Sequence, residues 1–494
     1  MKIRYLPIDD RNNLRVLRHT QDRSVILAIL GSIFNRPLYT LQALWEYRKW
    51  FLELTDDEIK ENPPLAFGKS QIFQMQGEIK KAIDVLDCID KNHPYYLITK
   101  LMLQGLDVRE KSVLIKAMDE HNWQFKNLLL TAGRPSVMNG AWDLSLYADE
   151  IVSGEKGEFY ELLKILYPES HQRIFDCILA EALYQRDDCY NALVHIVGQI
   201  PMLKEAEDMR ILFPMLTHEI FILVLNGQAQ GSENLISNLR QQLVHNNLEA
   251  YLPNIDALDA WSAMYDGDYL RVGRWLREGA PDEISKFCML DLFRYMVKMR
   301  AYIILGKNLA VTSLANRLIP LLEEGGRYMD LCELHTISAM NEFSIGEREK
   351  ALDHFEKAVA LAEKFRFDRV IADEGIRILE IIKLYIKERE KTPYLLRIKE
   401  LAEKVAIIHP KYLKKHLPKN SALTETEMKI LRLLSVNYTN SQIADITETA
   451  IDTVKQHCKH ICAKLEVKNR HQAVDRAIEL GMLEPVRAGT MLNV

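Results

Sequence analysis

The sequence predicts an all-α protein in which a long array of helical repeats is followed by a small helical domain. Three observations lead to this fold class. Glycine and proline are scarce, with 21 and 16 copies among 494 residues, and a chain with so few turn-forming residues favours helices over strands. Glycines recur at a nearly constant interval through the middle of the chain. Closely spaced helix-start patterns follow near its C-terminal end.

Composition excludes several classes of protein. The 64 Lys+Arg and 69 Asp+Glu leave a net charge of −5, so the chain as a whole has no general attraction for nucleic acid. Seven cysteines without dense spacing favour a reducing compartment. The first residues contain no signal-peptide pattern, and apolar runs such as the one from Val25 end far short of the ~20 residues that span a membrane. We therefore expect a cytoplasmic protein with no membrane partner.

Glycines mark the repeated unit at intervals of 40, 39 and 40 residues, at Gly227, Gly267, Gly306 and Gly346. Asp187 stands another 40 residues earlier in a similar context, and Gly77 marks a more distant copy. A slim side chain follows each mark by five positions, at Ala82, Ala192, Ser232, Val272, Val311 and Ala351. Glycine permits a tight turn between two helices, and small side chains let those helices approach closely. Since one helix pair cannot bury its apolar face alone, such pairs are expected to stack.

This pattern resembles the tetratricopeptide repeat. Its period near 40 exceeds the usual ~34 residues, which implies longer helices. The alternative is an irregular helical bundle with chance glycines. We expect a helical region with at least one such repeat over 1–170, a repeat array that acts as a sensor over 171–403, and a basic linker over 404–420. Pro410 and Pro418 interrupt helix continuity in that linker.

The C-terminal domain is predicted over 421–485. Thr424 with Glu427, and Thr439 with Gln442, have the spacing of a capping box that begins a helix. A third helix carries Val454, Cys458, Ile461 and Leu465 on one face, and a fourth starts near Arg470 and ends at Gly481. Short helices around one small core are typical of a helix-turn-helix module.

These residues resemble the LuxR-type DNA-binding domain. The matching positions are Leu423, Thr424, Glu427, Thr439, Asn440, Ile443, Ala444, Thr453, Val454, Lys455, His457, Lys464, Leu465, Val467, Arg470, Ala473 and Val474. The resemblance implies that this domain binds double-stranded DNA through the major groove.

Charge placement agrees with that implication. From Thr453 to Arg470 there are five basic residues, which are Lys455, Lys459, Lys464, Lys468 and Arg470, against the single acid Glu466. Lys455 and Lys459 are four positions apart and share a helix face. The resemblance implies that Lys455, Gln456 and Lys459 reach base edges or nearby phosphates. It also implies that Thr453, Asn440, Ser441 and Lys464 anchor the DNA backbone.

Two features of this domain are left open by the sequence. Ala450 stands where the family has a capping serine, and Thr449 with Asp452 offers a cap one residue earlier. The resemblance suggests a homodimer on DNA through the last helix, by Ala473, Val474, Ala477 and Ile478. The same residues could instead close the core of one copy.

A repeat array joined to a LuxR-type domain resembles the large maltose-activator (MalT-like) regulators, whose array receives an inducer or a protein partner. Those regulators also carry a nucleotide-binding module, which we do not expect here. The nearest phosphate-loop pattern is Gly68-Lys69-Ser70, with Pro63 where the first glycine should stand. Pro63 and Pro64 instead predict the start of a repeat helix that contains Lys69.

The third predicted helix of the C-terminal domain carries several candidate metal ligands. His457, Cys458, His460 and Cys462 lie on one predicted helix, whereas zinc needs ligands that converge from two elements. A redox-sensing pair of Cys458 and Cys462 is an alternative. No catalytic arrangement of side chains stands out, so we expect no metal, no cofactor and no enzyme activity. An aromatic group around Gly267 either contacts the effector or packs between repeats. Its members are Trp261, Tyr265, Tyr269 and Trp275.

Taken together, the sequence predicts a transcriptional regulator that binds specific DNA sites and contacts RNA polymerase. Its helical repeats would sense a small-molecule, peptide or protein effector. The alternative is an interaction scaffold whose degenerate helix-turn-helix domain binds protein rather than DNA.

Overall fold

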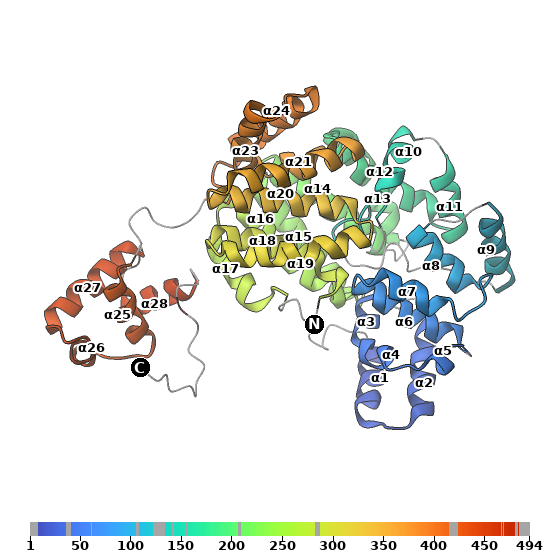
Figure 1. Cartoon of the computed structure of the whole chain (residues 1–494), viewed down its shortest axis with the longest axis horizontal. Coiled ribbons are helices and arrows are strands. Elements are labelled where there is room, and N and C mark those ends of the chain that lie inside the picture. The colour runs from blue at the N-terminus through green and yellow to red at the C-terminus, as the bar shows by residue number, and fades with distance from the viewer. Residues whose placement is uncertain are drawn as a thin grey trace.

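The computed structural model of the chain is an all-α structure, as predicted (Figure 1). It describes residues 8–35, 41–60, 62–104, 108–121, 134–140, 143–154, 156–205, 209–281, 287–413, 423–465, 467, 469–479 and 483. Within these ranges, β pairing is limited to one isolated bridge between Asn139 and Asp143. None of the helices in these ranges is long and apolar enough to cross a membrane.

The N-terminal helices are α1 (Ile8–His19), α2 (Arg23–Ser32), α3 (Leu41–Glu46), α4 (Arg48–Leu52), α5 (Asp56–Lys60), α6 (Pro63–Met75), α7 (Ile79–Leu86), α8 (Pro94–Gln104), α9 (Val108–His121), α10 (Ala148–Ser153) and α11 (Glu158–Leu166). The central helices are α12 (His171–Gln185), α13 (Cys189–Glu205), α14 (Met209–Leu225), α15 (Ala229–His245), α16 (Leu252–Asp266), α17 (Tyr269–Glu278), α18 (Leu292–Ile304), α19 (Asn308–Glu324), α20 (Tyr328–Ser344), α21 (Arg348–Phe365), α22 (Asp368–Ala372), α23 (Gly375–Glu388) and α24 (Pro393–Ile408). Short 3₁₀ helices are η2 (Ile33–Asn35), η3 (Ser145–Tyr147), η4 (Glu249–Tyr251) and η6 (Met289–Asp291). The C-terminal helices are α25 (Glu425–Ser435), α26 (Asn440–Thr447), α27 (Ile451–Lys464) and α28 (Arg470–Glu479).

The predicted repeat marks lie in the tight turns that join consecutive helices. Gly227, Gly267, Gly306 and Gly346 all have a positive φ, as do Gly77 and Asp187. The slim residues five positions later are buried, at Ala82, Ala192, Ser232, Val272, Val311 and Ala351. The marks therefore separate the helix pairs α6/α7, α12/α13, α14/α15, α16/α17, α18/α19 and α20/α21. The helical-repeat fold class is thus confirmed, whereas the specific resemblance to tetratricopeptide repeats stays a prediction.

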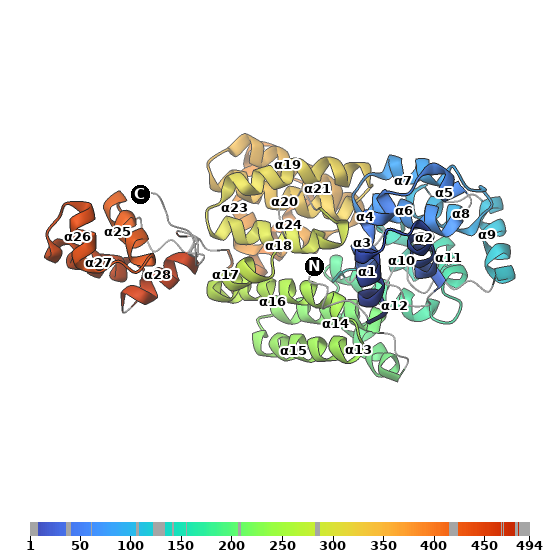
Figure 2. The ribbon, with the colours of Figure 1, turned by 90° about the horizontal axis from the view of Figure 1, so that it is seen from below.

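The two helices of a pair have different surroundings. In the pair α18/α19, the first helix is buried on most sides, since α18 buries ten of its 13 residues. The second helix buries one face only: α19, of 17 residues, buries four, namely Val311, Ala315, Leu318 and Leu322. First helices therefore form the inside of the array and second helices its outer layer, and Figure 2 shows the pairs following one another.

The N-terminal region and the array share one hydrophobic core, which extends from Leu14 to Leu413. The turn at Gly77 packs against Leu321 of α19. Arg134 reaches Asp330 of α20, with 2.7 Å between Nη2 and Oδ1. The expected boundary near residue 170 is therefore no break in packing, because the chain folds back so that early and late helices meet.

The expected linker over 404–420 is packed on the array in its first part. Helix α24 continues to Ile408, and His409, Tyr412 and Leu413 after it are buried. Pro410 follows the helix end, as its effect on helix continuity predicts. Residues 414–422, with Pro418, lie outside the described residues.

The Gly68-Lys69-Ser70 pattern lies inside α6, which starts at Pro63 as predicted. Gly68 packs so closely on Phe51 that a side chain there would collide with its ring. The Lys69 ammonium donates a hydrogen bond to the carbonyl of Leu54 at 2.6 Å. These residues therefore connect α6 to α4 rather than form a phosphate-binding loop.

Replacing Gly346 tests the role of the repeat turns. Gly346 has φ +88° with open space around its Cα, so Gly346→Ala should destabilise the fold by about 1 kcal/mol through backbone strain alone. Gly198, inside α13 and equally uncrowded, is the matched control, and Gly198→Ala should stabilise by roughly 0.5–1 kcal/mol. Thermal unfolding of both variants measures the contrast. Equal shifts would show that the turn needs no glycine.

A pair of histidines, buried His335 and half-buried His354, should make the array sensitive to mild acid. Burial, followed by the imidazole of His354 at 3.0 Å between Nδ1 atoms, lowers the pKa of His335 to about 4. The unfolded chain takes up a proton near pH 6.5, so His335 should reduce stability as pH falls from about 6.5 to about 4. Thermal midpoints across this range should fall more steeply for wild type than for His335→Leu. The exposed His245 gives the control His245→Leu, which should keep the wild-type slope.

Candidate DNA-binding site

The C-terminal domain has a hydrophobic core of its own, to which all four of its helices contribute. Ile430 of α25 and Ile443 of α26 meet Val454 and Ile461 of α27 and Ala473 of α28 there, each fully buried. Figures 1 and 2 show these helices as a group beside the array, where α28 approaches α17. Because Val454 and Ile461 point into the core, the opposite side of α27 is turned to solvent.

Reciprocal caps begin α25 and α26, as predicted. The Thr424 hydroxyl accepts a hydrogen bond from the Glu427 N–H, and the Glu427 carboxylate accepts one from the Thr424 N–H at 2.7 Å. Thr439 and Gln442 repeat this exchange at the start of α26, where the side-chain oxygen of Gln442 lies 2.9 Å from the Thr439 nitrogen. Both caps satisfy N–H groups that a helix start leaves free, so the entry of each helix is fixed locally.

The solvent-facing side of α27 carries the predicted base-contacting residues. Lys455, Gln456 and Lys459 are exposed, and so is Thr453 in the first turn. The Lys455 ammonium lies 2.9 Å from Asp452, in an exposed pair one turn apart. Such a pair is weak in water, so it leaves Lys455 available to a phosphate or a base. Lys468 and Glu466, which entered the charge count, lie outside the described residues.

The remaining candidates for DNA contact have varied surroundings. Ser441 and Arg470, in the first turns of α26 and α28, are exposed. Asn440 is half-buried, and its Oδ1 has no hydrogen-bond partner among the described residues. The Lys464 ammonium donates to Glu427 at 2.6 Å, in a pair that joins α27 to α25. Burial would raise the pKa of Glu427, but Lys464 and the cap hydrogen bonds lower it. Lys464 therefore already has a structural role in the domain.

Helix α27 starts without a side-chain cap. Its N-cap residue is Ala450, which offers no hydrogen-bond acceptor. The suggested cap by Thr449 and Asp452 is not formed: the Thr449 hydroxyl instead lies 2.9 Å from that of Thr447. Of the two possibilities left open by the sequence, the structure has Ala450 as the N-cap residue. Helix α26 ends at Thr447 with Glu448 in the left-handed conformation, and the turn engages the Thr449 side chain.

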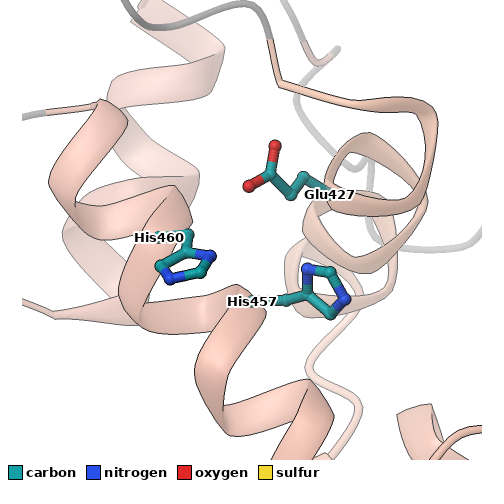
Figure 3. Close-up of side chains that lie close together, drawn as sticks. All are labelled: Glu427, His457 and His460. Carbon is teal, nitrogen blue, oxygen red and sulfur yellow. The ribbon is translucent and has the colours of Figure 1, made fainter.

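Three side chains of this domain could approach a metal ion. Glu427 of α25 lies beside His457 and His460 of α27, with ligand atoms within 4.8 Å of one another (Figure 3). The Nδ1 of His457 is buried without a partner among the described residues. However, the Lys464 ammonium already occupies the Glu427 carboxylate, so a cation would have to displace that charge. The expectation that the chain holds no metal stays a prediction.

The residues suggested for dimer contact lie on α28. Ala473 and Ala477 are fully buried and close the core of this copy, and Val474 packs half-buried against it. The side chain of Ile478 lies outside the described residues. Ala473 and Ala477 are therefore core residues in the single chain, and a dimer through Val474 stays a prediction.

The aromatic group around Gly267 is divided between two surroundings. Trp261 and Tyr265 of α16 line a cavity inside the array. Tyr269 of α17 donates a hydrogen bond to the carbonyl of Lys411 at 2.6 Å, and Trp275 is buried in α17. Only the first two can meet a molecule in the cavity.

Sequence reasoning missed the charged residues that line this cavity. Glu181, Arg300 and Glu333 lie on the inner helices α12, α18 and α20. Each stands in a largely apolar helix, as in the stretch VKMRAYII around Arg300. A charged residue within an apolar helix could have indicated a buried ion pair, since buried charges are rare unless they are paired.

Comparison with known proteins supports the assignment of the C-terminal domain. Residues 421–477 match the sequence profile described as bacterial regulatory proteins, luxR family. Over 72 residues the chain is 40% identical to the response regulator protein VraR of Staphylococcus aureus and of Staphylococcus epidermidis. That stretch is 15% of this chain and 34% of each relative, so the chain spans about a third of the length of the curated relatives that it matches. The C-terminal domain is a LuxR-type helix-turn-helix domain.

Supplying the missing cap should stabilise α27. Ala450→Ser places a hydroxyl where the first free N–H groups of the helix need an acceptor, for a gain of about 1 kcal/mol. Hydrogen exchange of amides in the first turn of α27 should slow accordingly. Thr449→Ser, which keeps the hydroxyl outside the capping position, is the matched control and should leave exchange there unchanged. Faster exchange in Ala450→Ser would mean that the turn depends on alanine.

Proposed function

We propose that this chain is a transcriptional regulator that binds specific sites in double-stranded DNA. The observation that carries the proposal is the exposed face of α27 with Lys455, Gln456 and Lys459, in a domain of the LuxR type. Lysine ammonium groups suit guanine O6 and N7 in the major groove, and a glutamine amide suits adenine. Thr453, Ser441 and Arg470 are exposed in the first turns of α27, α26 and α28. Contacts from these positions to phosphates would orient the domain.

The proposal extends to the rest of the chain. The helical array would sense an effector and so control DNA binding or the contact with RNA polymerase. An effector changes such a balance only if it binds one arrangement of the protein better than the other. A homodimer on DNA would favour two half-sites arranged about a two-fold axis. We assign no enzyme activity to the chain.

The proposal is tested by selecting fragments of host DNA with the full-length protein at near-physiological salt. Wild type should enrich a few discrete sites. The double variant Lys455→Ala/Lys459→Ala should bind those sites about thirtyfold or more weakly, because each lysine contributes roughly 1–3 kcal/mol. For each lysine that contacts a phosphate, the slope of log affinity against log salt should decrease by about one.

Lys383→Ala is the matched control for this experiment. Lys383 lies on the array and pairs with Glu380 one turn away at 3.0 Å, as Lys455 pairs with Asp452. Its removal changes the net charge without touching α27, so DNA selection should be unaffected. Equal losses in the control and in α27 variants would indicate a general charge effect.

An interaction scaffold is the alternative function, in which the C-terminal domain binds protein rather than DNA. The missing cap at Ala450 favours it, because the entry of α27 is less fixed than in the family pattern. Residues 414–494 alone, which begin after the last packed residue of the array, discriminate between the two. Enrichment by this fragment but not by the full chain would mean that the array masks DNA binding. Failure of both would support the scaffold.

A further inference from the structure

The inner helices of the array line a cavity of about 110 Å³, which is partly open to solvent. Each of the first helices α12, α14, α16, α18 and α20 contributes to its wall, and so do α22 and the segment from Arg134 to Asn139. A cavity of this size with an open side can hold a small organic ligand, since an enclosed cavity of ~150 Å³ holds a benzene ring.

Each positively charged side chain in the cavity wall already lies beside an opposite charge. Arg300 contacts both Glu374 and Glu333, and Arg369 contacts Asp373. Arg134 pairs with Asp330, which does not itself line the cavity. His218 lies 3.6 Å from Glu181; burial would lower the pKa of His218, but this carboxylate raises it. A ligand with a net charge would find no unpaired counter-charge in this wall.

Several polar atoms of the lining residues nevertheless have no partner. Nε of Arg134, Nε of Arg369, Oδ1 of Asn139 and Oε1 of Gln185 are buried without hydrogen bonds among the described residues. These atoms comprise two donors and two acceptors, and an unpaired buried polar atom is costly. Beside them lie flat apolar surfaces, with Phe221 and Trp261 in edge contact at 4.7 Å between ring centroids. The wall thus fits a molecule that combines an apolar face with both acceptors and donors.

Two cavity residues also hold the segment that leads to the C-terminal domain. The ring of Tyr412 stacks on Tyr265, with centroids 4.1 Å apart and planes inclined by 16°. Its hydroxyl donates to Oε2 of Glu374 at 2.7 Å, and Oε1 of the same carboxylate accepts from Nε of Arg300 at 2.8 Å. Tyr265, Glu374 and Arg300 therefore have one side on the cavity and the other toward Tyr412.

The rest of this segment is fastened to the array by backbone contacts. Nε2 of His409 lies 2.7 Å from the carbonyl oxygen of Val224. Tyr269 donates to the carbonyl of Lys411, and Arg377 donates to that of Leu413. Residues 409–413 thus form the last packed part of the array before the LuxR-type domain.

We propose that this cavity binds a small organic molecule of no net charge, with hydrogen-bond acceptors and donors around a flat apolar face, and that its occupancy tightens the docking of residues 409–413 through Tyr412. The inference rests on the proposed regulatory function and supplies its sensor site. Arg300, Glu374 and Tyr265 also line the cavity, so an occupant packed against them restricts their movement. Glu374 in turn holds the Tyr412 hydroxyl.

The ligand class is tested with a panel of compounds matched in shape and different in charge. Tryptophan is compared with tryptamine and indole-3-propionate, nucleosides with their monophosphates, and hexoses with hexose phosphates, by thermal shift and isothermal titration on the full chain. At least one compound without net charge should bind about tenfold or more tightly than its charged counterparts. Equal binding of charged counterparts, or binding by no uncharged or zwitterionic compound, would overturn the ligand class.

A variant that should fold normally assigns the binding to this cavity. Gln185→Met keeps the side-chain size and removes an oxygen that has no partner in the described part of the chain, so it should preserve stability and weaken binding about tenfold. Gln242→Met is the matched control, since Gln242 has an unpartnered oxygen on the outer helix α15 and should bind as wild type. Equal binding by Gln185→Met would place the ligand elsewhere.

The coupling between ligand binding and the docking of residues 409–413 is measured by hydrogen exchange of these residues in the absence of DNA. Addition of the bound compound should slow exchange there about fivefold or more, the low end of coupling between linked sites. Tyr412→Phe keeps the stacked ring but loses the hydroxyl, so it should bind the compound and lose most of this protection. Unchanged exchange in wild type would overturn the coupling. Because neither measurement involves DNA, a failure here is distinct from a failure of the proposed DNA binding.

Discussion

The array depends on charges that are buried among its inner helices and must pair with one another. Asp330 of α20 is fully buried and receives Arg327 from the preceding turn and Arg134 from nearly two hundred residues earlier. A buried carboxylate without such partners is strongly destabilising. Burial would raise the pKa of Asp330, but the two guanidinium groups, Arg134 first, lower it. This requirement joins the N-terminal region to the middle of the array and explains why one core extends through both.

The same constraint creates the cavity. First helices of successive pairs are surrounded by protein, so their polar side chains can be satisfied only toward the inside of the array. Arg300 and Glu374 meet there from α18 and from the residue that directly precedes α23. These ion pairs use most of the hydrogen-bonding groups of the charged side chains. A few donors and acceptors beside aromatic rings have no partner among the described residues. A polar interior with paired charges is therefore a consequence of stacking helix pairs around a closed inner surface.

The C-terminal domain is stabilised in another way. Its core is small and separate from that of the array, and its helix starts are fixed by local exchanges such as that between Thr424 and Glu427. Because the core and the local caps stabilise the domain, most side chains on the outer face of α27 are not needed for folding. Lys464 is an exception, since it donates a hydrogen bond to Glu427. Residues 409–413 lie between the two parts of the chain in sequence, and Tyr412 and Leu413 belong to the core of the array. Any change in how Tyr412 is held thus acts where the two parts join.

The sequence by itself determined the features that depend on neighbouring residues: the turns at Gly227 and Gly346, the two capping boxes, the start of α6 at Pro63 and the basic face of α27. Each of these features arises from interactions between residues a few positions apart, so a short sequence pattern is enough to predict it. Only the tertiary structure decided that Ala450 begins α27 without a cap, that Tyr412 is packed rather than part of a linker, and that Trp261 and Tyr265 face a cavity while Tyr269 does not. Those outcomes depend on partners far away in the chain. Arg134 with Asp330, or Tyr412 with Tyr265, share no spacing rule, because the curvature of the whole array brings them together.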